Sequence, residues 1–200
     1  MQKRRISTRS LVVTAMLSAV AFVLMFIEFP VPFMPSFVKL DISDLPPLLG
    51  SFALGPVFGV VIEFLKNLLH ILIKGTSSNY VGEMFNFLCG SFMCLSAGII
   101  YHFKRTRMGA LVASVIGCVI MALGSLPLNY FIVYPAYELF YGLPMPAIIG
   151  MYQAILPSVD SLLECLLVFN VPFTFFKGML DVIICFLIYK PLSPILHGRK

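Results

Sequence analysis

The sequence has few charged residues. Only 12% of its 200 residues are Asp, Glu, Lys or Arg, whereas 60% are hydrophobic. A soluble domain carries roughly twice this share of charge. Together with a mean hydropathy of +0.98, this composition excludes an ordinary soluble domain and indicates an integral membrane protein. Lys and Arg (14) exceed Asp and Glu (9). In a membrane protein this excess indicates contact with anionic lipid and a basic cytoplasmic side, and we expect no nucleic acid partner.

The sequence also lacks the common catalytic motifs. There is no Gly-x-Ser-x-Gly, no His-Glu-x-x-His and no phosphate-binding loop, since residues 50–55 are followed by Pro56 where that loop would need a lysine. The five cysteines form no Cys-x-x-Cys, and the three histidines lie far apart. We therefore expect no metal, no cofactor and no enzyme activity. Any uphill transport would draw its energy from a partner or an ion gradient.

Long apolar segments divide the chain into membrane helices. A run of about 18 apolar residues can span a bilayer. We predict an all-α integral membrane protein with one domain, 1–200, and six transmembrane helices, at residues 10–29, 48–73, 81–101, 108–128, 148–169 and 172–190. Residues 172–190 are expected to begin a new helix at Pro172. The basic N-terminus is interpreted as the anchor of the first helix rather than as part of a signal peptide.

Six crossings place both termini on one side, the cytoplasmic side of a bacterial cell membrane, because both ends are basic. Lys66 and Lys74 would then also lie inside. The link at 102–107, with Lys104, Arg105 and Arg107, would lie outside, against the positive-inside rule.

A proline-rich segment, residues 29–47, connects the first two predicted helices and would lie outside. It contains Pro30, Pro32, Pro35, Pro46 and Pro47. Proline fixes φ and removes a donor, so the segment cannot be helical and is partly rigid. It is predicted to be a lid or binding loop, although a rigid interfacial turn fits the same residues.

Two helix faces carry polar side chains inside apolar segments. Glu63, Lys66, Asn67 and His70 share one face, which should point toward protein or water. The alternative is a cytoplasmic helix end with a simple ion pair. Thr174, Lys177 and Asp181 share another face. Lys177 could donate to a ligand, or could simply pair with Asp181.

Two further features could contact partners. Asn129, among aromatic residues just after Pro127, could bind a planar polar ligand or could satisfy backbone carbonyls that the proline leaves free. Ala15 and Ala19 form a small-residue strip where another helix can approach closely. Internal packing is the other interpretation of that strip.

Several of these stretches resemble the riboflavin-binding S components of energy-coupling factor (ECF) transporters. The resemblance rests on Lys-x-Asp-x-Ser-Asp-x-Pro at 39–46, Leu-Lys-Asn-Leu-Leu-His at 65–70, and residues 82–87, 129–137 and 172–190. It covers nearly the whole chain. It implies six helices, with the first external loop covering one riboflavin near the outer face, and docking onto a transmembrane T component driven by two ATP-binding subunits.

The resemblance also implies roles for particular residues. Ala15 and Ala19 match the docking motif, and riboflavin is a transported ligand rather than a cofactor. The substrate-binding residues would be Leu40, Asp41, Ser43, Asn129, Tyr137, Asn170, Thr174 and Lys177. Thr174 stands where the family often has Asn, and Asn170 could take that role.

Three alternatives remain from the residues themselves. The chain could bind another vitamin. It could be an intramembrane enzyme using Glu63 and His70, or the pair Asp160 and Glu164, provided that the groups converge on one cavity. It could also be an assembly subunit without a ligand, in which case no closed pocket should lie beneath residues 30–47.

Overall fold

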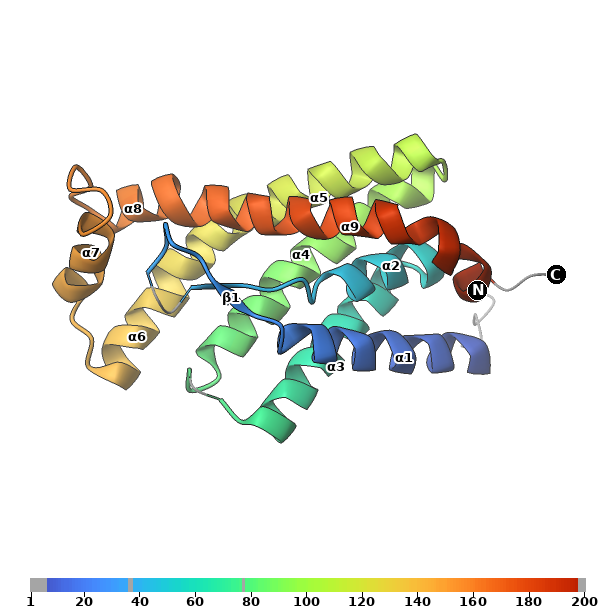
Figure 1. Ribbon diagram of the computed structural model, residues 1–200, viewed down its shortest axis with the longest axis horizontal. Coiled ribbons are helices and arrows are strands. Elements are labelled where there is room, and N and C mark those ends of the chain that lie inside the picture. Colours follow the sequence, from blue (N-terminus) through green and yellow to red (C-terminus); the bar gives the residue numbers. More distant parts are fainter. Residues whose placement is uncertain (1–6, 36–37, 77, 198–200) are drawn as a thin grey trace, which may run out of the picture.

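The computed structural model describes residues 7–35, 38–76 and 78–197, most of which are helical (Figure 1). Five helical segments in this part of the chain are long and apolar enough to cross a membrane. They are Thr8–Met25, Pro56–Lys74, Val81–Phe103, Arg107–Tyr141 and Leu162–Ile188. A shorter apolar helix, Leu45–Leu54, lies between the first two.

The first helix, α1 (Thr8–Met25), begins at Ser7, whose hydroxyl accepts a hydrogen bond from the Ser10 amide. The segment that follows contains two short antiparallel strands, β1 (Phe29–Pro30) and β2 (Lys39–Leu40), in which Phe29 pairs with Leu40. These strands draw the ends of the connecting segment together.

The single helix predicted at 48–73 is wrong. The structure has two helices there, α2 (Leu45–Leu54) and α3 (Pro56–Lys74). They separate at Gly55, whose φ of 116° is one that residues other than glycine rarely adopt. Pro56 then opens α3, because a first-turn residue needs no backbone donor. Pro46 and Pro47 open α2 for the same reason and do not belong to the loop.

The next two helices are joined by a short link. α4 runs over Val81–Phe103, and α5 (Arg107–Leu128) begins at Thr106, whose hydroxyl accepts from the Gly109 amide. The predicted end at 128 is too early. A π-helical turn, η1 (Asn129–Val133), continues the helix into α6 (Tyr134–Tyr141). The wider turn after Pro127 keeps the helix going where the proline removes a bond.

The helix predicted at 148–169 is also wrong. α7 covers only Met145–Gln153, and α8 (Leu162–Cys165) passes through a second π-helical turn, η2 (Leu166–Asn170), into α9 (Val171–His197). Pro172 therefore lies inside a continuous helical segment and does not open one. The π turn directly before it relieves the clash that its ring would make with a regular preceding turn.

The main core lies among α2, α4, α5 and α9. Its fully buried side chains include Leu48, Met93, Cys118 and Val182. Helices α2 and α4 approach closely at Gly98, where an added Cβ would lie 2.2 Å from the Ser51 hydroxyl oxygen. A second cluster, around Tyr134 and Tyr152, joins α6, α7 and η2.

The break at Gly55 changes the direction of the rest of the chain. The start of α1, the α4–α5 link and the end of α9 lie at one end of the molecule, on the right in Figure 1. The α3–α4 link and α7 lie at the other end. The expectation that residues 102–107 lie opposite the termini is therefore wrong. So is the grouping of Lys74 with the termini, because Lys74 ends α3 at the far end.

Candidate ligand-binding site

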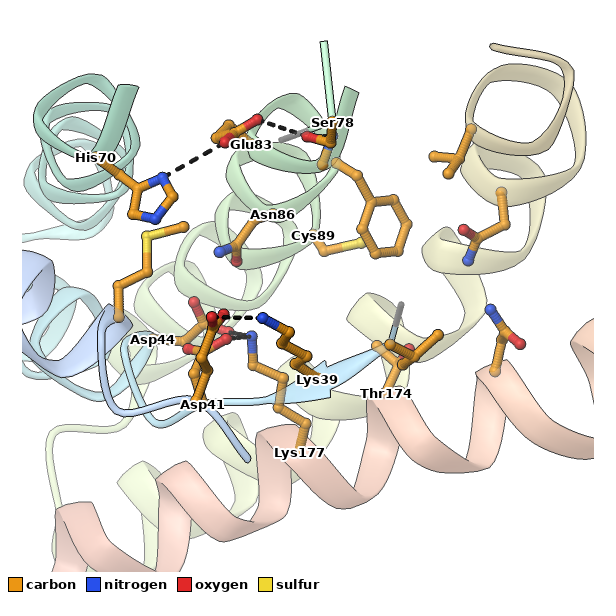
Figure 2. A pocket seen from close by; sticks show the side chains of 18 of the residues that line it. Lys39, Asp41, Asp44, His70, Ser78, Glu83, Asn86, Cys89, Thr174 and Lys177 are labelled. Atoms are coloured by element: carbon orange, nitrogen blue, oxygen red, sulfur yellow. Dashed lines mark hydrogen bonds and ion pairs between the residues drawn. The ribbon is translucent and has the colours of Figure 1, made fainter. Parts of the chain in front are cut away.

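A cavity of about 440 Å³ opens at the end of the molecule that carries the α3–α4 link (Figure 2). It lies between the segment around β2, the end of α3, the start of α4, the two π turns and α9. Ligand pockets for small molecules typically have 300–1,000 Å³ and a few converging polar groups. Both conditions hold here, and a cavity of this size beside β2 counts against an assembly subunit without a ligand.

Three lysines line the cavity, Lys39, Lys74 and Lys177, and Lys177 on α9 is the least exposed of them. Its Nζ lies 3.0 Å from Asp41 Oδ2 and 3.2 Å from Asp44 Oδ2 (Figure 2). Asp41 follows β2, and Asp44 directly precedes α2. The ion pairs therefore join the loop between α1 and α2 to the last helix.

The alternative that Lys177 simply pairs with Asp181 is wrong. Both carboxylate oxygens of Asp181 are buried and lack a hydrogen-bond partner among the described residues. One turn of separation permits an i, i+4 pair. In the folded molecule, however, the Lys177 ammonium forms ion pairs with two carboxylates from another part of the chain.

Another lysine, Lys66, lies behind this cluster and contacts one of its carboxylates. Lys66 on α3 is fully buried, forms an ion pair with Asp44, and places its Nζ 2.8 Å from Glu63 Oε2. It also donates to the Ser43 hydroxyl at 3.0 Å. Buried charges require such pairing because desolvation costs several kcal/mol per ion. Asp44 thus bridges the two lysines.

The polar face of α3 points into the protein, as the sequence predicted. All four of its residues are buried: Glu63, Lys66, Asn67 and His70. The alternative of an ion pair at a solvated helix end is wrong, since the Glu63–Lys66 pair is fully buried.

The opposite wall carries amides and phenols at the two π turns. Asn129 is the first residue of η1 and Asn170 the last of η2. Asn170 accepts a hydrogen bond from Tyr152 at 2.7 Å and donates to Tyr134 at 3.1 Å. These bonds fix the direction of the Asn170 amide at the cavity. π turns of this kind are frequent at functional sites.

A polar rim that sequence reasoning missed lies where α3 ends and α4 begins. Glu83 Oε2 accepts from Thr76 (3.0 Å) and Ser78 (2.8 Å), and Glu83 Oε1 lies 3.4 Å from His70 Nδ1 (Figure 2). Asn86 lies one turn further along α4 and also lines the cavity. The sequence feature that could have predicted this rim was the run of polar residues at 74–79, which lies between two polar helix ends.

At the mouth, Glu28 joins two lysines from different elements. Its Oε1 lies 2.6 Å from the Nζ of Lys39 and 3.2 Å from that of Lys74. Partial burial by itself would raise the pKa of Glu28, but hydrogen bonds from the two lysines outweigh burial and lower that pKa. Glu28 therefore stays ionised and keeps the loop attached to α3.

The structure brings most of the predicted ligand residues to this one cavity. Six of the eight line it: Asp41, Asn129, Tyr137, Asn170, Thr174 and Lys177. The other two do not belong to the lining. Leu40 pairs with Phe29 in the sheet, and the Ser43 amide donates to Asp41 at 2.9 Å. Ala15 and Ala19 are exposed on α1.

The residues of the enzyme alternative do not converge. His70 lines the cavity, whereas Glu63 lies outside the lining and pairs with Lys66. Asp160 and Glu164 are exposed, and Glu164 Oε2 accepts from the Asp160 amide at 2.9 Å near the start of α8. Within the described ranges no cluster of His, Cys, Asp and Glu could hold a metal ion.

A bundle of apolar helices around one buried, mixed polar and aromatic cavity defines a membrane protein that binds a small molecule. Comparison with known proteins gives the family. The model of the family "ECF transporter, substrate-specific component" matches residues 9–189, and the chain belongs to that family.

Named relatives agree with this assignment. The chain is 34% identical to the riboflavin transporter RibU of Staphylococcus aureus, over 92% of this chain and 90% of that one. It is 32% identical to the riboflavin transporter FmnP of Bacillus subtilis, over 96% of each. A solved structure titled "Structure and mechanism of the S component of a bacterial ECF transporter" has a TM-score of 0.72 and 34% identity. The match covers 95% of this chain and 98% of that chain.

Membership in this family settles two of the open alternatives. The chain is a substrate-binding transport component in a membrane and not an enzyme. What it binds is inferred next.

Proposed function

We propose that this chain captures riboflavin in the cavity around Lys177 and delivers it across a bacterial cell membrane, using energy from partner ATPases. The observation that carries the proposal is the convergence of Asn129, Asn170 and Lys177 on one cavity of about 440 Å³. The names of the relatives supply the ligand, since both are riboflavin transporters.

The chemistry of the cavity suits this ligand. Riboflavin is neutral and planar, with a polar pyrimidine edge and a ribityl chain of hydroxyls. Amides and an ammonium can hydrogen-bond such an edge, while Tyr134, Tyr137 and Phe173 supply apolar walls. We infer that riboflavin is the transported cargo and not a cofactor.

The segment between α1 and α2 would cover the ligand. Asp41 would line the site. Leu40 would fix the backbone next to Asp41 through its pairing in the sheet, and the Ser43 amide would hold the Asp41 carboxylate through a hydrogen bond. Thr174 would offer a hydroxyl beside the amide of Asn170. On this proposal, the predicted ligand residues either line the cavity or support a residue that lines it.

The proposed topology has six crossings, with α2 as a short sixth. Its ten residues span about 15 Å, about half the hydrocarbon thickness. Six crossings put both termini on one side of the membrane, and we infer from the positive-inside bias that this is the cytoplasmic side, with the cavity near the outer face. The basic α4–α5 link then also lies inside, in agreement with the positive-inside rule.

The proposed partners are a transmembrane T component and two ATP-binding subunits. Ala15 and Ala19 would form the docking surface, because they are exposed on α1 and small enough to admit a close helix. Membrane lipid would cover the remaining apolar surface, and no nucleic acid would take part.

Titration of the purified, flavin-free chain with riboflavin tests the proposal. We expect quenching of riboflavin fluorescence with nanomolar to micromolar affinity, since the cavity is preformed. Lumichrome, which keeps the ring and lacks the ribityl chain, should bind more weakly. Absence of flavin binding in a folded, monodisperse sample, or preference for an unrelated vitamin, would overturn the riboflavin assignment.

A further inference from the structure

A second cavity, of about 550 Å³, opens at the opposite end of the molecule. It lies between the end of α2, the start of α3 and the last turn of α4. Its lining residues are Ser51, Phe52, Ala53, Leu54, Gly55, Pro56, Gly98, Ile99, Tyr101, His102, Phe103 and Arg105. It shares no residue with the cavity around Lys177.

One cation, Arg105, lines this cavity, and two more, Lys104 and Arg107, lie within two positions of it in the α4–α5 link. All three are exposed, and none forms an ion pair in the part of the chain that the structure describes. His102 Nδ1 lies 2.8 Å from Arg105 Nη2. Arg105 donates that bond if the imidazole is neutral, which holds the guanidinium at the rim.

Acidic residues are absent from every segment near this end. No Asp or Glu occurs at 45–62 or at 84–137, and none follows Asp181. The charged side chains of the α4–α5 link are therefore all positive, which favours an occupant with negative charge.

The walls of the cavity are mainly apolar. Phe52, Ala53 and Leu54 come from α2, and Ile99 and Phe103 from α4. Ile99 is 48% exposed and Phe103 is 85% exposed, on a helix long and apolar enough to cross the membrane. The cavity is thus continuous with apolar surface that hydrocarbon would cover. A free anion or an acidic peptide would gain little binding energy from these apolar walls.

We propose that this second cavity binds an anionic phospholipid. Its phosphate would lie against Arg105, with Lys104 and Arg107 beside it, and part of an acyl chain would fill the space along Phe52, Leu54 and Ile99. Basic pockets between membrane helices on the cytoplasmic side recognise acidic lipid headgroups in this way. The proposal is independent of what the cavity around Lys177 binds.

Native mass spectrometry of the delipidated chain in detergent tests the proposal. The probes are dioleoyl phosphatidylglycerol, dioleoyl phosphatidylcholine with the same chains, and glycerol 3-phosphate without chains. We expect phosphatidylglycerol to bind best. Equal binding of the two lipids overturns recognition of charge, and equal binding of glycerol 3-phosphate overturns the role of the acyl chain.

Variants locate the binding. The double change Lys104→Gln with Arg105→Gln should weaken phosphatidylglycerol binding by about fivefold per charge, or roughly 25-fold together. The matched control is Lys39→Gln with Lys74→Gln, which removes the same charge at the other end and should leave lipid binding unchanged. Ala53→Phe, which fills the cavity without altering charge, should weaken lipid binding and leave glycerol 3-phosphate unaffected.

The outcome is decisive in each case. Unchanged lipid binding in the Lys104/Arg105 variant, or an equal loss in the Lys39/Lys74 control, overturns the proposal. If Ala53→Phe does not fold, the charge variants alone still decide, with monodispersity and melting temperature reporting their folding.

Discussion

At the scale of residues, the buried Lys66 and the half-buried Lys177 have different neighbours and different consequences. Lys177 lines the ligand cavity, whereas Lys66 lies behind it, and Asp44 contacts both. A ligand that hydrogen-bonds to Lys177 competes with Asp41 and Asp44 for the same ammonium. Because Lys66 also neutralises Asp44, that carboxylate remains paired when Lys177 turns toward a ligand.

Lys177→Met should weaken riboflavin binding by about 1–3 kcal/mol, because a charge-assisted hydrogen bond is lost while the volume is roughly kept. Fluorescence titration measures the change. Asp181→Asn is the matched control, since Asp181 is a buried acidic residue one turn away that does not line the cavity. Equal affinity of Lys177→Met and the unmodified chain would restrict Lys177 to a structural role.

Gly90→Ala should destabilise the protein by about 1–3 kcal/mol, the usual cost of overpacking. An added Cβ would lie 2.5 Å from the Glu63 carboxyl carbon, and Glu63 is held by Lys66. The melting temperature in detergent reports the effect. Gly150→Ala on α7 is the control, because its Cβ would meet nothing within 4 Å. Similar melting temperatures for the two variants would contradict the packing argument.

At the scale of elements, the outer face of α1 is separate from the ligand cavity. Ala15 and Ala19 are exposed, while Thr14, Ser18 and Ala21 form the buried side. A single helix thus offers one face to the protein and another to the surroundings, so changes on the outer face can affect assembly without changing the cavity.

Ala15→Trp or Ala19→Trp should abolish riboflavin uptake in cells that express the full transporter, and should spare riboflavin binding by the purified chain. The indole would hold a partner helix away from α1. Leu123→Trp, at another exposed site on α5, controls for a bulky membrane-facing residue and should retain uptake. Uptake by both Ala variants would refute the docking role of α1.

At the scale of the whole molecule, the break at Gly55 decides on which side each later link lies. Because α2 and α3 are separate helices, the α4–α5 link lies at the end that holds the start of α1 and the end of α9 (Figure 1). In the proposed orientation, with that end in the cytoplasm, the three cations of the link agree with the positive-inside bias instead of opposing it.

Cysteine labelling in intact cells tests this topology. Lys104→Cys should react with a membrane-impermeant maleimide only after permeabilisation, and Asp160→Cys should react before it, because the two lie at opposite ends of the molecule. The five native cysteines are buried, so background labelling should be low. Labelling of Lys104→Cys in intact cells would place that link outside and would contradict the proposed membrane orientation.

The sequence determined the properties that depend on local pattern. Residence in the membrane follows from the length of apolar runs, and the buried face of α3 follows from the 3.6-residue period of Glu63, Lys66, Asn67 and His70. Helix ends and interruptions were less predictable. Gly55 divides an apolar run that looks continuous in the sequence. The π turns η1 and η2 let the helical segments continue through Pro127 and Pro172, because a wider turn tolerates a missing backbone donor.

Only the tertiary structure decided which charges meet. Asp181, at helical spacing, was as good a partner for Lys177 by sequence as any residue, yet Asp41 and Asp44 hold it from more than 130 positions away. Local spacing gives the set of possible partners, but the choice among them depends on which helices pack together, and that follows from burial across the whole chain.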